Sequence, residues 1–124
     1  MRHSCLPVNA QRAIFIGSSS EAAGLAAHIA SAITAAGMSA VTWNGGTFPA
    51  GQTLIERIES LPHEFDGAVL LATPDISCTR RGESFVAPAS NVIFEYGYLS
   101  SRLTRRRVVI CRFRRAEIPS DVAG

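Results

Sequence analysis

The side chain best suited to chemistry is Glu95, a carboxylate inside an otherwise apolar segment. It lies in the run NVIFEYGYL at residues 91–99, whose other members are nearly all core-forming types. Moving a carboxylate out of water is costly unless it has a partner, and burial raises its pKa. Perturbed carboxylates in clefts are active-site candidates. The alternative is a glutamate on the one solvated stripe of a helix, paired with Arg102 or Arg106. Spacing alone does not decide between these interpretations.

A glycine and three serines, Gly17, Ser18, Ser19 and Ser20, follow the first strand-like segment. Small residues here let a ligand approach the backbone, and a helix N-terminus favours an anion such as phosphate. The alternative is ordinary capping, because Ser18 and Glu21 have the spacing of a capping box. The chain has neither a G-x-G-x-x-G fingerprint nor a Walker lysine, so neither a Rossmann dinucleotide site nor a P-loop is predicted.

Four further side chains are candidates for substrate contacts. Trp43, Phe48 and Tyr98 could each cover a purine or pyridine ring, although such residues more often belong to a core. Asp75 follows a strand-like segment and could bind a ribose hydroxyl or simply begin a turn. No metal is expected, because no histidine has a partner at metal-ligand spacing.

The composition favours one globular domain without a membrane segment. The three cysteines are widely spaced, which argues against a disulfide framework and favours a reducing compartment. Residues 1–10 lack the apolar core of a signal peptide, and no run approaches the roughly twenty apolar residues of a membrane helix. We therefore expect a cytoplasmic protein with no membrane partner.

The positive charge is uneven. The formal net charge is +2, yet seven of the twelve arginines fall within residues 102–115. A nucleic-acid surface and a solvated helix end are both compatible with this cluster. Because no aromatic residues interleave with the first arginines, the solvated surface is favoured and no nucleic-acid partner is expected.

The elements that position these residues alternate between strand and helix. This pattern predicts an α/β fold with a flavodoxin-like parallel sheet in the order 2-1-3-4 and helices on both faces, the first helix opposite the others. Ligands of such sheets bind outside the carboxyl ends of the strands. The predicted strands are 12–16, 38–43, 67–72 and 107–111, and a long loop is predicted at 74–89.

The helix ends are predicted from local signals. The first helix should begin at the Ser18 capping box and end before Gly37. The second should begin at a capping box formed by Thr53 and Glu56 and end at Pro62. The third should begin at a cap formed by Ser90 or Asn91 and run to about residue 103.

Six segments, in this order and spacing, resemble the TIR-like domain family described as predicted nucleotide-binding proteins. The resemblance covers residues 12–124, and residues 1–11 are then an N-terminal extension. Its most specific parts are the NVIFEYG segment and the IPSD tail. The six segments are residues 14–21, 43–51, 66–75, 91–97, 107–110 and 118–124.

The resemblance implies a TIR domain of bacterial anti-phage defence, such as CBASS. Many of these domains hydrolyse NAD and release nicotinamide when a fused or associated sensor of the STING or SAVED type binds a cyclic nucleotide and drives TIR–TIR assembly. NAD is then the substrate and no separate cofactor is expected. The family's catalytic glutamate corresponds to Glu95, its serine loop to residues 18–20, and its loop after the second strand to residues 44–51.

Two departures from the family pattern concern the site. An arginine that often precedes the Asn-Val pair is replaced by Ala89 or Ser90, and a second aspartate that often follows Thr-Pro-Asp is Ile76. The chain also stops where the family's fifth strand would begin, so we expect a fragment of a longer sensor–effector protein, or a divergent short member of the family. A non-catalytic assembly or adaptor module and a nucleoside or nucleotide N-glycosidase remain alternative functions.

Overall fold

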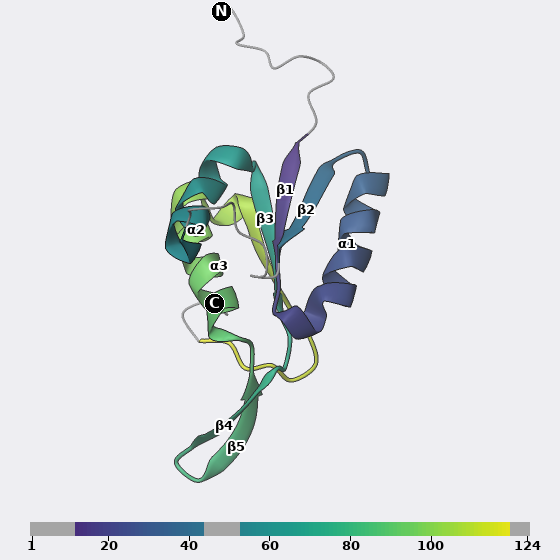
Figure 1. Ribbon diagram of the computed structural model, residues 1–124. Coiled ribbons are helices and arrows are strands. Elements are labelled where there is room, and N and C mark those ends of the chain that lie inside the picture. The colour runs from purple at the N-terminus through teal and green to yellow at the C-terminus, as the bar shows by residue number, and fades with distance from the viewer. Residues whose placement is uncertain (1–11, 44–52, 120–124) are drawn as a thin grey trace, which may run out of the picture.

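A four-stranded parallel sheet forms the centre of the molecule (Figure 1). The computed structural model describes residues 12–43 and 53–119. The strand order is β2-β1-β3-β6, which confirms the predicted flavodoxin-like order. The four strands are β1 (Ala13–Gly17), β2 (Ser39–Trp43), β3 (Gly67–Ala72) and β6 (Val108–Arg112).

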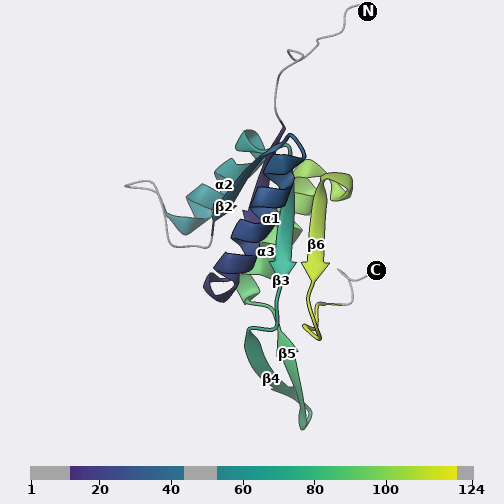
Figure 2. The same cartoon turned by 90° about the vertical axis from the view of Figure 1, so that its right-hand side faces the viewer.

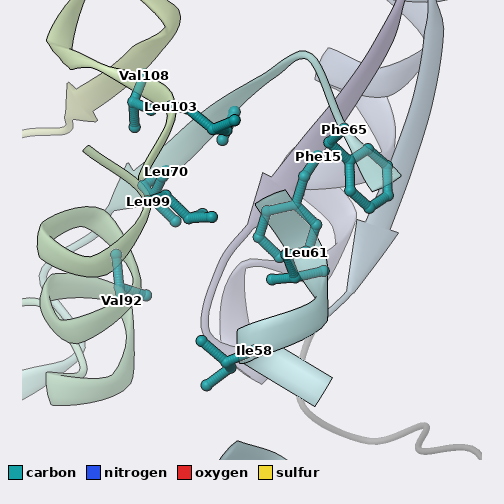
Figure 3. Packing of buried hydrophobic residues seen from close by; sticks show 10 residues of the cluster. Phe15, Ile58, Leu61, Phe65, Leu70, Val92, Leu99, Leu103 and Val108 are labelled. Atoms are coloured by element: carbon teal, nitrogen blue, oxygen red, sulfur yellow. The ribbon is translucent and has the colours of Figure 1, made fainter. Parts of the chain in front are cut away.

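Helices cover both faces of this sheet, as predicted (Figure 2). One face carries α1 (Ala23–Ala35), and the other carries α2 (Leu54–Glu64) and α3 (Ser90–Leu103). Successive strand residues point to opposite faces, so each strand feeds both cores. Phe15 and Leu70 join the core under α2 and α3 (Figure 3), whereas Ile16 and Leu71 join the core under α1.

The capping box predicted at Ser18 is wrong. The Ser18 hydroxyl donates to the carbonyl of Ser19 instead of accepting from a helix N–H. The chain then makes a short 3-10 turn, η1 (Ser20–Ala22), which has no side-chain cap, before α1 begins. The other end is as predicted: α1 ends just before Gly37, whose φ of 95° suits a glycine.

The capping box predicted for α2 is confirmed. The Thr53 N–H donates to Oε1 of Glu56 at 2.8 Å, and the Glu56 N–H donates to Oγ1 of Thr53 at 3.2 Å. The predicted end at Pro62 is wrong, because the helix continues to Glu64. A proline this near the end removes one backbone hydrogen bond without stopping the last turn.

The third helix has the predicted extent but not the predicted cap. It runs from Ser90 to Leu103, while Ala89 is the N-cap and no side chain caps the helix. Neither Ser90 nor Asn91 therefore serves as the cap. A 3-10 turn, η2 (Arg105–Arg107), then leads into β6.

The long loop predicted at 74–89 is wrong: it contains an antiparallel hairpin. Its strands are β4 (Ile76–Arg80) and β5 (Glu83–Ala87), and it projects from the carboxyl end of β3 (Figures 1 and 2). Arg81 and Gly82 form the turn with φ values of 52° and 81°. Positive φ at both central residues matches the twist of a two-residue hairpin. The prolines that suggested a loop lie just outside the strands, where no ladder N–H is needed.

Candidate functional site

Glu95 lies on the buried stripe of α3 and is only 3% exposed. The solvated alternative is therefore wrong, because Glu95 occupies a core position while Arg102 and Arg106 are both exposed. No ion pair joins Glu95 to either arginine within the described ranges. The spacing of three or four residues along this stripe was a signal present in the sequence. The buried residues of α3 are Val92, Glu95, Leu99 and Leu103.

Gly17 makes room for the Glu95 carboxylate. A Cβ atom on Gly17 would lie 2.7 Å from Oε1 of Glu95 and 2.5 Å from Cδ1 of Leu70. Gly17 points to the same face of the sheet as Phe15, two residues earlier, which is the face that α3 covers. The structure thus joins two predicted site residues at the carboxyl end of β1, where ligands of such sheets bind.

The environment of Glu95 raises its pKa to about 7. Desolvation by burial is the larger cause, and a hydrogen bond from the side chain of Asn91 opposes it. Oε1 of Glu95 is buried and has no hydrogen-bond partner among the described residues. A buried carboxylate that titrates near neutrality with one unused oxygen is a strong candidate for a catalytic group.

The serine segment begins beside this carboxylate, directly after Gly17. Ser18 and Ser19 are buried, whereas Ser20 is exposed in η1. The hydroxyl of Ser19 is buried without a hydrogen-bond partner in the part of the chain that the structure describes. Among the described residues, three buried side-chain polar atoms have no partner: Oγ of Ser19, which follows β1 in the chain, Oε1 of Glu95, which lies beside Gly17, and Oγ of Ser100 further along α3. Unsatisfied buried groups in a native structure call for an explanation, and a ligand supplies one.

Two site residues were predicted at and after the second strand, and the structure describes only the backbone of the first, Trp43. Trp43 pairs with Gly17 in the parallel register, so its backbone lies beside the site. The direction of its side chain and the position of Phe48 lie outside what the structure describes.

Asp75 and Tyr98 make contacts that suit structural roles. The carboxylate of Asp75 accepts from the hydroxyl of Thr73, and its N–H donates to the carbonyl of Ala87 at 3.1 Å, at the base of the hairpin. The hydroxyl of Tyr98 donates to the backbone carbonyl of Glu59 at 3.4 Å and ties α3 to α2. The sequence left open a turn role for Asp75 and a packing role for Tyr98, and these contacts agree with both.

Asn91 was predicted only as a possible cap, yet its side chain lowers the pKa of the candidate catalytic residue, Glu95. Its position four residues before Glu95 places both side chains on one face of α3. The spacing of four residues is present in the sequence, but its relevance to the site follows only from the burial of Glu95.

Other predicted properties can be compared within the described ranges. No three histidine, cysteine or acidic side chains there lie close enough together to hold a metal ion. No helix of that part is long and apolar enough to cross a membrane. All seven arginines between residues 102 and 115 are exposed.

The parallel α/β fold and the carboxylate of Glu95, buried beside the carboxyl end of β1, define a TIR-like domain. The chain belongs to the family of CAP12/Pycsar effector TIR domains, whose model matches residues 13–124.

Named relatives agree with this family. The chain is 35% identical over 122 residues to the Pycsar effector protein BcPycTIR of Burkholderia cepacia, covering 94% of this chain and 40% of the relative. It is 36% identical over 121 residues to PaPycTIR of Pseudomonas aeruginosa, covering 96% and 39%. It is 32% identical over 111 residues to the CD-NTase-associated protein 12 of Flavobacterium daejeonense, covering 90% and 35%. The chain thus spans about two fifths or less of the length of these relatives.

Proposed function

We propose that this domain is an NAD glycohydrolase that cleaves the bond between nicotinamide and ribose, with Glu95 as its catalytic carboxylate. The observation that carries the proposal is Oε1 of Glu95, which is buried beside Gly17 and has no hydrogen-bond partner in the part of the chain that the structure describes. Membership in the effector TIR family supports the same activity.

One carboxylate suffices for this reaction. Nicotinamide leaves from NAD as a neutral molecule because its ring is cationic in the substrate, so the leaving group needs no proton. Most glycosidases need a second carboxyl group to supply one. The ionised Glu95 stabilises the positive charge that develops on the ribose, or holds the ribose hydroxyls, as the bond breaks. The backbone from Gly17 to Ser19 approaches the substrate closely because these residues are small.

The raised pKa of Glu95 sets the pH dependence of this activity. Activity requires the ionised form, so kcat/KM should fall below about pH 7, where the free protein binds a proton. The cationic ring of bound NAD favours the ionised form and lowers the pKa of Glu95 in the complex. The acidic limb of kcat should therefore lie at lower pH than that of kcat/KM.

We further propose that assembly activates the domain in anti-phage defence. Relatives are named as Pycsar effectors and as CD-NTase-associated proteins, and the chain spans a minor part of their length. The proposal gives this domain a fused or associated cyclic-nucleotide sensor and TIR–TIR contacts within a cytoplasmic homo-oligomer.

The test is release of nicotinamide from NAD by concentrated protein with a crowding agent, with assembly followed by light scattering. The wild type should release nicotinamide, and Glu95→Gln should not. Glu59→Gln is the matched control, because it makes the same chemical change on an exposed position of α2. The same assay with AMP, dCMP and deoxynucleosides separates NAD cleavage from other N-glycosidase activity.

Each result favours a different function. Release by the wild type and by Glu59→Gln alone supports the proposal. Release by all three proteins overturns the role of Glu95. Faster cleavage of a nucleoside or nucleotide than of NAD favours the N-glycosidase. No release by assembled wild type overturns NAD cleavage and favours a non-catalytic assembly module.

A further inference from the structure

The hairpin of β4 and β5 stands apart from the rest of the domain. It projects beyond the carboxyl end of the parallel sheet (Figures 1 and 2), and within the described ranges each of its strands forms a ladder only with the other. A two-stranded hairpin is marginally stable by itself in water, whereas three or more strands that share an apolar face are stable. A further strand beside the hairpin would therefore stabilise it.

One face of the hairpin is largely apolar. Residues directly opposite each other in an antiparallel pair share a face. Ile76 lies opposite Ala87, and Cys78 lies opposite Phe85. Ile76 is 41% exposed, and the guanidinium carbon of Arg80 lies 4.6 Å from the centre of the Phe85 ring. A strand added at the side of the hairpin would extend this face.

The hydrogen-bonding pattern identifies the backbone groups that β4 directs away from β5. In a hairpin with a two-residue turn, the residues that flank the turn exchange both backbone bonds, and bonded and non-bonded pairs then alternate along the ladder. The flanking residues here are Arg80 and Glu83. Ser77 and Thr79 therefore belong to the non-bonded pairs and direct their N–H and C=O groups outward.

The two outer edges of the hairpin differ. On β5, the carbonyl of Val86 accepts from the N–H of Glu117 at 2.8 Å, so the segment after β6 occupies part of that edge. On β4, no described residue bonds to the outward backbone groups of Ser77 or Thr79. Both side chains are small and neutral, without the charge or the proline that commonly protects an edge strand. Within the described ranges, the β4 edge is thus open to a further strand.

We propose that the β4 edge is an interface between two copies of this domain, in which the two β4 strands pair antiparallel about a two-fold axis at Cys78. The two hairpins then form one sheet in the order β5-β4-β4-β5. This inference rests on the proposed assembly of the domain, and it names a surface that carries it.

A second copy fits this edge because the strand is complementary to itself. Pairing about Cys78 uses the whole of β4 and places Ser77 opposite Thr79 of the other copy, so that their outward groups exchange both backbone bonds. Asp75, just before the strand, lies opposite Arg81 of the other copy, just after it. Opposite charges directly across a sheet stabilise the pair, and no like charges meet in this register.

The same pairing continues the apolar face from one hairpin to the other. Phe85 and Cys78 of one copy stand in a row with Cys78 and Phe85 of the other. Because the two strands run antiparallel, the two domains lie at opposite ends of the joined sheet. A two-fold contact of this kind closes on itself, so it produces a dimer.

The first test measures the dimer dissociation constant by sedimentation equilibrium and compares Thr79→Pro with Ser84→Pro. Thr79 and Ser84 are opposite each other, so each directs its N–H outward, from the β4 edge and the β5 edge respectively. Proline at either position removes an outward N–H and no bond of the hairpin itself. The loss occurs twice in a two-fold dimer, so Kd should rise about tenfold or more in Thr79→Pro. Ser84→Pro is the matched control and should keep the Kd of the wild type.

The second test reverses one charge of the proposed pairing. Arg81 has a φ of 52°, which aspartate tolerates better than most residues, so Arg81→Asp should keep the hairpin. It places a carboxylate opposite Asp75 at both ends of the pairing, and Kd should rise roughly threefold or more at low ionic strength and less in high salt. Arg105→Asp makes the same change at an exposed position outside the hairpin and should leave Kd unchanged.

The third test uses Cys78 to report the register. In the proposed pairing the two Cys78 residues form a non-hydrogen-bonded pair, whose Cα atoms lie about 4.5 Å apart, within the reach of a disulfide. Diamide oxidises two thiols to a disulfide and takes up their two hydrogens. It should link two copies of a Cys5→Ser variant through Cys78, as peptide mass spectrometry would show. The control adds Cys78→Ser and Ser84→Cys, which moves the thiol to the β5 edge, and should remain unlinked.

The results separate this interface from the proposed function. A Kd raised by Thr79→Pro and Arg81→Asp but not by their controls, together with the Cys78 link, supports the interface even if no nicotinamide is released. If Thr79→Pro does not fold, Arg81→Asp and the link decide. A protein that remains monomeric, a Kd that responds to Ser84→Pro and not to Thr79→Pro, or a dimer without the Cys78 link overturns the interface, even in a protein that cleaves NAD.

Discussion

Glu56 and Glu95 are two glutamates near the starts of neighbouring helices with opposite environments. Glu56 in α2 is exposed, and its carboxylate accepts from the Thr53 N–H within the capping box, which lowers its pKa. Glu95 in α3 is buried against Gly17, and its pKa is raised to about 7. The carboxylate of Glu56 caps the start of α2, whereas Oε1 of Glu95 has no hydrogen-bond partner among the described residues.

The difference shows what a buried candidate catalytic carboxylate costs the stability of the fold. An ionised group that is satisfied locally stabilises the folded state, whereas one that is buried with an unused oxygen destabilises it. Active-site residues commonly reduce stability for this reason. Four substitutions test the contrast, arranged from the largest expected effect to the smallest, and Gly97→Ala and Thr53→Ser serve as controls for two of them.

Glu95→Gln should raise the free energy of unfolding at pH 8. The folded-state pKa of about 7 exceeds the ordinary 4.5, so between these values the folded protein binds more protons than the unfolded chain. The wild type therefore loses stability as the pH rises through this window, and the penalty is complete above pH 7. It amounts to about 3 kcal/mol at most. Urea unfolding should show the gain at pH 8 and none at pH 4; equal stability at pH 8 would contradict the contrast.

Gly17→Ala should lower stability and also displace Glu95. The added Cβ would lie 2.5 Å from Cδ1 of Leu70, a tighter contact than packing allows. Overpacking of this kind costs about 1–3 kcal/mol. Thermal unfolding measures the loss, and nicotinamide release measures the displacement.

Gly97→Ala is the control for this glycine. Gly97 lies on the exposed side of α3, and nothing is within 4 Å of the Cβ that it lacks. Alanine in a helix interior should therefore stabilise the protein by about 0.5–1 kcal/mol, the opposite sign to Gly17→Ala. The same sign for both variants would show that backbone effects dominate over the contact with Glu95.

Thr53→Ala should cost about 1 kcal/mol, because the N–H of Glu56 loses its acceptor. The effect should be present at neutral pH and should leave the titration of Glu95 unchanged. Chemical denaturation measures the loss. Thr53→Ser keeps the hydroxyl and should restore most of the stability; failure to restore it would argue against capping as the cause.

Glu56→Gln should have the smallest effect, with the opposite sign to Glu95→Gln. The pKa of Glu56 is lowered, so its charge contributes stability above the ordinary pKa of 4.5. That contribution is lost as the pH falls through the lower, folded-state pKa. Glutamine can still complete a capping box, which limits the loss. Urea unfolding from pH 8 to pH 3 should show a small deficit that disappears in acid; a gain at pH 8 would erase the contrast with Glu95.

Much of the fold follows from the sequence. The alternation of apolar strands with amphipathic helices predicted the sheet order, and the four predicted strands lie within one or two residues of the observed ones. The capping box at Thr53 is confirmed because its geometry depends only on residues three apart. The hairpin was missed because its two prolines outweighed the alternation between them, and the cap at Ser18 because a competing backbone acceptor was not considered.

The candidate site was predictable only in part. The sequence alone selected Glu95 and Gly17 as residues that could do chemistry, and it gave the right kind of fold to bring them to one edge. Whether Glu95 pointed to water or to the core stayed open, because both stripes of α3 were compatible with the residue types. The effect of Asn91 on the pKa of Glu95 became apparent only once Glu95 was known to be buried.

The sequence by itself therefore determined the strands of the parallel sheet, the three long helices, their order and the identity of the unusual carboxylate, since these depend on local propensity and periodicity. Tertiary structure decided that α3 turns Glu95 toward β1 and that Gly17 leaves room for Oε1. The physical reason is that the burial and the pKa of Glu95 depend on how α3 packs against the sheet. This packing joins residues that are far apart in the chain, so local sequence patterns do not determine it.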